Sequence, residues 1–253
     1  MALRTGRKTS ASPGRWFSPM IRTILMLSFW VLVVPIAALI FFPWVLITGD
    51  ILPLYRTGIW AAWTGVRITG VKVHTVGRER LDPKRTYVFM SNHASVLDPP
   101  ILLPLVPGRT SVIVKRELFN YPILGKAMRM ASLVPVNRGD RDAGIAAVHT
   151  AADVVKQGIH MTIFVEGSRS FDGKLLPFKK GPFYLAEECQ TPVVPVTISG
   201  THAAMPKRRL SIKPGPVTVT FHSPIEPTEF GSREDLMEKV RAAISTALPP
   251  ELT

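Results

Sequence analysis

The sequence predicts an α/β fold, with a mostly parallel mixed sheet flanked by helices and an N-terminal membrane-anchoring helical segment. Short runs rich in valine and isoleucine alternate with longer stretches whose apolar residues recur at helical spacing, which predicts the sheet and its helices. An uncharged apolar run over residues 24–47 predicts the anchor. We therefore divide the chain into a basic N-terminal segment (1–22), a membrane-anchoring segment (23–69) and one folded domain (70–253).

The N-terminal segment carries positive charge only. The first 49 residues contain no acidic side chain, and their basic side chains are Arg4, Arg7, Lys8, Arg15 and Arg22. The whole chain has a net charge of +13, which favours an anionic partner: a membrane surface, a nucleic acid or a phosphorylated substrate. The uncharged run that follows favours the membrane. Basic residues before such a run indicate a cytoplasmic end, so we expect a membrane-associated protein with its functional site on the cytoplasmic face.

The anchor has two possible topologies. A helix over 24–47 would span roughly 36 Å, enough to cross a bilayer core. Pro35 and Pro43 each remove a backbone donor, however, and a second apolar stretch at 59–66 contains two tryptophans, which suit the headgroup zone. A hairpin or re-entrant anchor therefore fits as well as a single span. A cleaved signal peptide fits less well, because the run exceeds the usual length of roughly 7–15 residues. A buried core helix is the remaining alternative.

Short apolar runs after residue 70 predict the strands of one sheet. They cover 71–76, 87–90, 111–114, 133–136, 161–165 and 193–198. The internal Pro195 predicts an edge or bulge position for the last of these runs. Residues 210–212 and 217–221, on either side of a Pro-Gly-Pro turn, predict an antiparallel pair at one edge of the sheet.

Two helices are predicted with defined ends. Over 140–157 apolar residues recur at helical spacing, and the acidic Asp140 and Asp142 lie where the helix begins. Near the C-terminus, Ser232 precedes Asp235 by three residues, as in a capping pattern. The apolar face of this final helix consists of Leu236, Val240 and Ile244.

One histidine differs from the others in its context. His93 directly follows the predicted strand 87–90, at the end of a strand where open α/β sheets bind ligands, and it precedes Asp98 by five residues. On a regular helix these two side chains would point about 140° apart, so they act together only if a loop folds into a helical turn. A carboxylate at one ring nitrogen would leave the other free to take a proton. A purely structural hydrogen bond is the alternative. A metal site fits less well, because no second ligand lies nearby at the right spacing.

Three further segments extend this pattern. The chain reads Phe-Val-Glu-Gly-Ser-Arg at 164–169, Asn-Arg at 137–138 after a predicted strand, and Val-Pro-Val at 194–196. With these segments the sequence resembles the glycerolipid acyltransferases, most closely the 1-acylglycerol-3-phosphate (lysophosphatidate) acyltransferases. Their Asn-His-x-x-x-x-Asp block is matched by Asn92, His93 and Asp98.

The remaining blocks match with some departures. The block usually written Phe-Pro-Glu-Gly-Thr-Arg-Ser keeps Glu166, Gly167, Arg169 and a final serine, with Val165 in place of proline and Ser168 in place of threonine. In the second block the arginine is present as Arg138, preceded by asparagine where an acid or serine is common. Together the blocks cover residues 90 to 200.

The resemblance implies an acyltransferase domain over 70–253 and a direct transfer. His93, oriented by Asp98, would remove the proton of a lysolipid hydroxyl as it attacks the thioester of an acyl-coenzyme A or an acyl carrier protein. The acceptor would be the sn-2 hydroxyl of 1-acylglycerol 3-phosphate and the product phosphatidate. No cofactor, metal or acyl-enzyme is expected. The single cysteine, Cys189, excludes an internal disulfide and lies in a helix-like stretch with no evident base.

The resemblance also assigns substrate-binding residues. Arg138 and Arg169 are expected to bind the acceptor's phosphate, since guanidinium groups bind phosphate oxygens bidentately. Glu166 would hold the glycerol hydroxyl or orient Arg169, with a structural ion pair as the alternative. Gly167 would permit close approach of the backbone to the substrate. Lys115 would reach the phosphate or the donor. Asn92, from the first block, completes the expected set.

Alternatives remain at two levels. Within the enzyme class, the acceptor could be glycerol 3-phosphate or another lysolipid. From another class, a non-catalytic protein would bind anionic lipid through basic segments such as Lys207-Arg208-Arg209 with Lys213. A nucleic-acid-binding module is third, because basic and aromatic residues are not interleaved on one face. Acyl-chain length, the carrier and the oligomeric state do not follow from the sequence.

Overall fold

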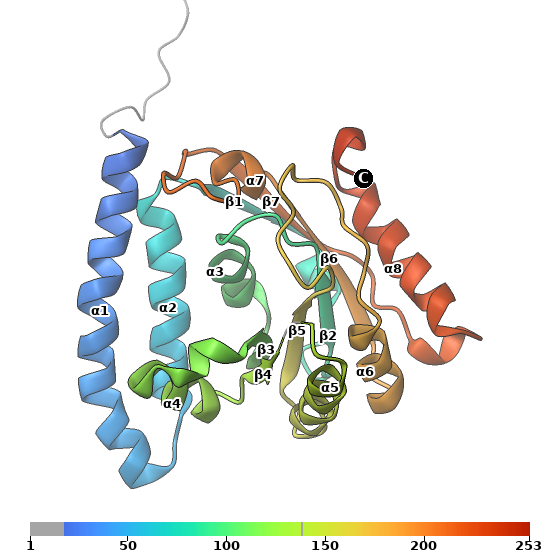
Figure 1. Ribbon diagram of the computed structural model, residues 1–253, viewed down its shortest axis with the longest axis horizontal. Coiled ribbons are helices and arrows are strands. Elements are labelled where there is room, and N and C mark those ends of the chain that lie inside the picture. Colours follow the sequence, from blue (N-terminus) through green and yellow to red (C-terminus); the bar gives the residue numbers. More distant parts are fainter. Residues whose placement is uncertain (1–17, 138) are drawn as a thin grey trace, which may run out of the picture.

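A seven-stranded sheet forms the centre of the computed structural model, which describes residues 18–137 and 139–253 (Figure 1). Its strand order is β1-β7-β6-β2-β5-β3-β4, and every pairing is parallel except that of β6 with β7. The strands are β1 (Lys72–Val76), β2 (Val88–Ser91), β3 (Thr110–Lys115), β4 (Val134–Val136), β5 (His160–Phe164), β6 (Val193–Ser199) and β7 (Pro216–Phe221). The predicted mostly parallel α/β sheet is confirmed.

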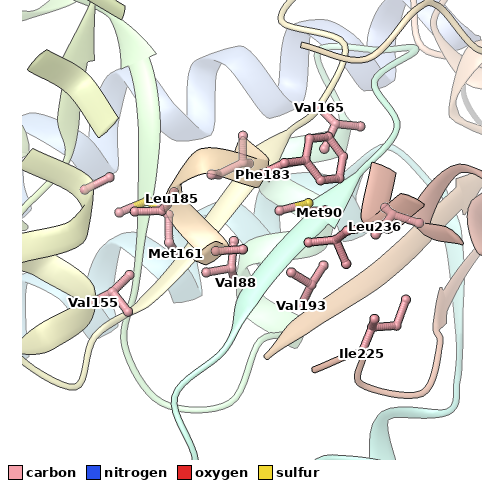
Figure 2. Close-up of a cluster of buried hydrophobic side chains, with 14 of the residues drawn as sticks. Val88, Met90, Val155, Met161, Val165, Phe183, Leu185, Val193, Ile225 and Leu236 are labelled. Carbon is pink, nitrogen blue, oxygen red and sulfur yellow. The ribbon is translucent and has the colours of Figure 1, made fainter. Parts of the chain in front are cut away.

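Helices cover both faces of the sheet, because buried strands present apolar side chains alternately to each face. In β2, Val88 and Met90 join one cluster and Phe89 joins the other. The first cluster, shown in Figure 2, is closed by α5 (Arg141–Lys156), α6 (Gly181–Cys189) and α8 (Arg233–Thr246). The second contains residues of α1 (Pro19–Thr48), α2 (Leu52–Ile68), α3 (Asp98–Leu102) and α7 (Thr201–Ala204). The remaining α-helix, α4 (Pro122–Met130), lies between β3 and β4 in the chain.

The two helices with predicted ends begin at their expected caps. The side chain of Asp140 accepts from the backbone N–H of Ala143 at the start of α5, and Ser232 accepts from Asp235 N at the start of α8. Such caps satisfy backbone donors that have no partner inside the helix. The predicted apolar face of α8 is buried, at Leu236, Val240 and Ile244. Both predictions are confirmed.

Residues 210–212 do not form the predicted strand. The N–H of Ile212 donates to Thr23 Oγ1 of α1 at 2.9 Å, and the Ile212 side chain is fully buried in the second cluster. Ile212 is therefore fixed against the anchor helix and does not join the sheet. β7 instead pairs antiparallel with β6 and parallel with β1, so it is an inner strand and β1 forms that edge.

Pro195 lies in an inner strand, which excludes the edge position that its missing N–H suggested. β6 runs between β2 and β7. On the β7 side, Val196 pairs with Phe221 while Val193 bridges Ile225, so the partner chain has one residue more between the two pairs. Pro195 falls within this slip in register, where a ladder hydrogen bond is absent. The bulge alternative is therefore the one that the structure adopts.

The N-terminal segment folds as a helical hairpin. α1 continues through Pro35 and Pro43 to Thr48, and Gly49 ends it in a left-handed conformation (φ 71°) with its N–H bonded to Val45 O. α2 then runs back beside α1 (Figure 1). The indole N–H of Trp30 donates to Ala61 O at 3.0 Å and joins the two helices.

α1 is long and apolar enough to cross a membrane by length and composition. Its most apolar window has a mean hydropathy of 2.7 and only 6% of it is buried. Apolar side chains such as Leu39 and Ile47 are 77% and 84% exposed. This exposure excludes the buried-core alternative and makes α1 a candidate membrane anchor. The division of the chain at residues 22 and 69 stays a prediction, and Arg4, Arg7, Lys8 and Arg15 lie outside the described residues.

Candidate active site

His93 and Asp98 lie in contact where β2 ends. After Ser91 the chain leaves the sheet as a short loop, and Asp98 begins α3. This loop and helical turn bring the two side chains together, with His93 Nδ1 at 2.7 Å from Asp98 Oδ2. A loop that enters a helical turn is the geometry that a five-residue spacing requires if the two side chains act as a pair.

The Asp98 carboxylate is buried and holds the whole loop. Its Oδ2 accepts from the backbone N–H groups of Ala94 and Ser95 at 2.8 and 2.7 Å, as well as meeting His93. The side chain is 0% exposed, and its Oδ1 has no partner among the described residues. A carboxylate accepts hydrogen bonds, so Nδ1 carries the proton. Nε2 is then the nitrogen that can take a proton from a substrate.

The imidazole plane is fixed by an aromatic neighbour. The Phe164 ring, at the end of β5, stacks on the His93 ring with centroids 4.2 Å apart and an interplanar angle of 25°. β5 is paired directly to β2, with Ser91 opposite Phe164. The sheet register therefore sets this contact, and the His93 side chain is left 12% exposed.

Glu166 binds the backbone of the loop 92–97, which carries His93 and is called the catalytic loop for its proposed role. Its Oε1 accepts from His93 N at 2.7 Å and its Oε2 from Leu176 N at 2.9 Å, and the residue is 3% exposed. The pKa of Glu166 is raised to about 7, because burial and, to a smaller extent, the charge of Asp98 together outweigh the lowering effect of the two backbone N–H groups and Arg241. The geometry therefore shows Glu166 holding the loop that carries His93, and its contact with substrate stays a prediction.

The turn after Glu166 closes on the same loop. Gly167 has φ 70°, a conformation that glycine adopts without the steric cost that a Cβ brings, and its N–H donates to Phe164 O at 3.0 Å. Ser170 N then donates to His93 O at 3.0 Å. The backbone N–H and C=O of His93 are thus both held by this one segment.

Asn92 has a different role from the one expected. Its Nδ2 donates to Ile198 O at 2.9 Å and its Oδ1 accepts from Ile198 N at 2.8 Å, with the residue 4% exposed. Both ends of the amide are used to fasten the end of β2 to β6. Asn92 therefore positions His93 and has no exposed face for substrate.

The basic side chains expected to bind phosphate include two that lie at or after the carboxyl ends of strands. Lys115 ends β3, is half exposed and pairs with Glu117 at 2.9 Å. Arg169 is partly exposed in the turn that follows β5, and its backbone oxygen accepts from Lys207 Nζ at 2.8 Å. Arg138, the other arginine expected to bind phosphate, lies outside the described residues.

Sequence reasoning did not select two residues of the site. Phe164 orients the ring of His93, and Ser170 holds its carbonyl. Both belong to the Phe-Val-Glu-Gly-Ser-Arg-Ser segment, so membership of that block was the available signal. The hydrogen bond from Ser170 N to His93 O, however, joins residues far apart in the chain, and the sequence does not indicate it.

A metal centre finds no support in the part of the chain that is described, where no three His, Cys, Asp or Glu side chains gather as ligands. Cys189 is partly buried, and burial raises the pKa of its thiol. A raised pKa keeps the thiol protonated and makes it a poor nucleophile. That the reaction needs no cofactor stays a prediction.

The arrangement defines a class of protein. A histidine paired with a buried carboxylate at the carboxyl end of a parallel strand lies where open α/β sheets bind their ligands. Residues 72–199, about half of the chain, match the family described as Acyltransferase. The chain belongs to this acyltransferase family.

Similar proteins carry more specific names. The chain is 37% identical over 144 residues to a 1-acyl-sn-glycerol-3-phosphate acyltransferase of Cocos nucifera, covering 56% of this chain and 47% of that protein. It is 32% identical over 181 residues to 1-acyl-sn-glycerol-3-phosphate acyltransferase alpha of Homo sapiens, covering 70% and 64%. The chain spans about half to two thirds of the length of the curated relatives that it matches.

A solved structure covers nearly the whole chain. The crystal structure of the 1-acyl-sn-glycerophosphate acyltransferase of Thermotoga maritima has a TM-score of 0.73 and 27% sequence identity to this chain. The match covers 90% of this chain and 95% of that one. The fold, including most of the N-terminal region, is therefore shared with that enzyme.

Proposed function

We propose that the protein transfers a fatty acyl chain from a thioester donor to the sn-2 hydroxyl of 1-acylglycerol 3-phosphate, forming phosphatidate. The observation that carries this proposal is the His93–Asp98 pair, joined at 2.7 Å with the His93 backbone held by the Glu166–Ser170 turn. The names of the relatives supply the acceptor, since several are called 1-acyl-sn-glycerol-3-phosphate acyltransferases.

The proposed reaction proceeds in one displacement. Nε2 of His93 takes the proton of the acceptor hydroxyl while the oxygen attacks the thioester carbonyl. The new C–O bond forms, the C–S bond breaks, and the thiolate leaves with the proton that His93 has taken. Asp98 stabilises the imidazolium that exists between these proton transfers. The chain needs no covalent intermediate for this sequence of steps.

The acceptor's phosphate binds to arginine in this proposal. Arg169 lies one residue from Ser170, which bonds His93, so its guanidinium can hold a phosphate near the reactive hydroxyl. Arg138 is proposed for the same role on its sequence position. Lys115, on the same edge of the sheet, is proposed to contact either the phosphate or the donor.

The membrane supplies the lipid substrate in this proposal. The exposed apolar side chains of α1 hold the domain at the bilayer, where the acceptor resides. Extracting a lipid would cost about 0.8 kcal/mol for each methylene transferred to water. The positive charges that precede α1 support a site on the cytoplasmic face. Acyl-coenzyme A and acyl carrier protein are both retained as donors.

The test is acyl transfer by the purified, detergent-solubilised protein. We expect phosphatidate from long-chain acyl-coenzyme A or acyl carrier protein with lysophosphatidate, and loss of this activity in His93→Ala. His74→Ala is the matched control, because His74 is exposed on β1 at the far edge of the sheet. Activity that survives His93→Ala would reject the mechanism. If the acyl chain is transferred only to glycerol 3-phosphate or to another lysolipid, that compound replaces 1-acylglycerol 3-phosphate as the acceptor in the proposal.

A further inference from the structure

Two cations lie over one exposed aromatic ring beside the turn that carries Arg169. Nζ of Lys207 is 3.7 Å from the centroid of the Phe171 ring, and Cζ of Arg208 is 5.2 Å from it. The same Lys207 Nζ donates to Arg169 O at 2.8 Å. Phe171 is 56% exposed, so the cluster faces solvent.

Both segments of this cluster are fastened to the catalytic loop. On one side, Ser170, which lies between Arg169 and Phe171, donates its N–H to His93 O at 3.0 Å. On the other, Met205, two residues before Lys207, accepts from Ser95 Oγ at 2.8 Å through its backbone oxygen. Both segments are at the same end of the sheet in Figure 1. The cations therefore stand at the rim of the site and not on a remote surface.

The cluster lacks an acidic counterpart. Within residues 18–137 and 139–253, no acidic side chain forms an ion pair with Arg169, Lys207 or Arg208. Like charges held close together repel, and a bound anion relieves that repulsion. Arg208 also has φ 69°, a left-handed backbone conformation that residues other than glycine seldom adopt. The chain thus holds a second cation over the ring at a conformational cost.

We infer that Lys207 and Arg208, with Arg169, bind the phosphate of the lysolipid acceptor and give the enzyme its preference for a phosphate monoester. This inference rests on the proposed function. A phosphate monoester carries about two negative charges near neutral pH, and lysine and arginine are its usual ligands. The cations are then part of the acceptor site and are more than a basic patch that attracts membrane headgroups.

The test compares charge-removing variants in the same loop. In the double variant Lys207→Gln, Arg208→Gln we expect the KM for lysophosphatidate to rise about 10- to 100-fold, the loss typical of charge-assisted hydrogen bonds. The kcat and the KM for acyl-coenzyme A should stay near wild type. Lys207→Arg should retain the wild-type KM. Arg209→Gln is the matched control, because Arg209 is an exposed cation beside Arg208 without a contact to Phe171 among the described ring contacts.

Three results would overturn the inference: an unchanged KM for lysophosphatidate, a rise confined to the acyl-coenzyme A KM, or an equal effect of Arg209→Gln. The last result would indicate general attraction to anionic lipid. Calorimetric titration with glycerol 3-phosphate separates this inference from the proposed function, since it needs no turnover. Wild-type binding that is weakened in the double variant supports the site even if lysophosphatidate is not acylated. If the double variant turns over normally with an unaltered KM for lysophosphatidate, the phosphate site alone is rejected. If the wild type neither binds glycerol 3-phosphate nor acylates lysophosphatidate, the phosphate site and the proposed function are both rejected.

Discussion

At the residue scale, the position of His93 is determined from several directions at once. Asp98 fixes Nδ1, Phe164 fixes the ring plane, Glu166 holds the backbone N–H and Ser170 holds the backbone carbonyl. Each contact restrains a different degree of freedom. In the proposed reaction this restraint means that His93 needs little reorganisation before it accepts a proton, which is the advantage that positioned catalytic groups have over groups in solution.

Asp98→Asn should separate charge from geometry. An asparagine oxygen in the place of Oδ2 can still accept from Ala94 N, Ser95 N and His93 Nδ1, so we expect the fold to persist. The negative charge that stabilises the imidazolium is lost, and kcat should fall by up to about 10⁴-fold, as for the equivalent change in a serine-protease triad. Acyl-transfer assays and thermal unfolding would check this. A wild-type kcat would show that Asp98 serves structure alone.

Glu166 should make the stability of the protein depend on pH. Its pKa is raised from 4.5 to about 7 in the folded state, so its contribution is fully present below pH 4.5 and is lost as the pH rises through 7. The loss is on the order of 3 kcal/mol. Glu166→Gln should remove this dependence and leave only a constant offset, because one backbone N–H then faces an amide group. Denaturant unfolding of both proteins at pH 5 and pH 8 would show it. Parallel pH profiles would contradict the prediction.

At the scale of elements, the helical hairpin depends on close packing at one glycine. A Cβ at Gly65 in α2 would lie 2.5 Å from Trp30 Nε1, which donates its hydrogen bond to Ala61 O. The indole therefore fits against α2 only because that position has no side chain. A second contact between elements lies at the end of β2, where the side-chain amide of Asn92 forms two hydrogen bonds with the backbone of Ile198 in β6.

Alanine substitutions in α2 should test this packing. Gly65→Ala should displace Trp30 and destabilise the protein by about 1–3 kcal/mol, the usual cost of overpacking. Gly58 lies in the same helix with nothing within 4 Å of its would-be Cβ, so Gly58→Ala should be neutral or stabilise by up to about 1 kcal/mol. Thermal unfolding in detergent compares the two. Equal effects of both substitutions would show that the contact with Trp30 is unimportant.

At the scale of the whole molecule, the apolar surface is concentrated on one helix. The most exposed large apolar side chains include Val31, Leu39 and Ile47, all on α1. α1 and α2 contribute to the core cluster on one face of the sheet, while α5, α6 and α8 cover the other. The helical hairpin is therefore on one face of the sheet, and its outer helix α1 is the candidate membrane anchor.

Leu39→Asp should weaken membrane association without unfolding the domain. Leu39 is 77% exposed, and placing a carboxylate there loses apolar burial and introduces a charge. We expect the partition coefficient onto phospholipid vesicles to fall at least about tenfold. Ile145→Asp is the control, because Ile145 is an exposed apolar residue of α5 on the other side of the sheet. Flotation assays measure both, and a similar loss in the control would remove α1 from its proposed role.

Local properties of the protein were predictable from the sequence alone. Alternating and helical periodicities indicated the seven strands near their observed limits, and capping residues located the starts of α5 and α8. The spacing of His93 and Asp98 implied a loop that enters a helical turn, which the structure has. These features depend on residues close together in the chain, so a single sequence contains the information.

Only the tertiary structure decided which distant segments meet. Residues 210–212 became a buried segment against α1, β7 became an inner strand, and Pro195 fell at a register slip. The hydrogen bonds of Glu166 to His93 and of Asn92 to Ile198, which support the loop that carries His93, were likewise visible only in the structure. Each outcome depends on hydrogen bonds between residues dozens of positions apart. Such partners are chosen by the closure of the whole chain, and periodicity along one segment does not report them.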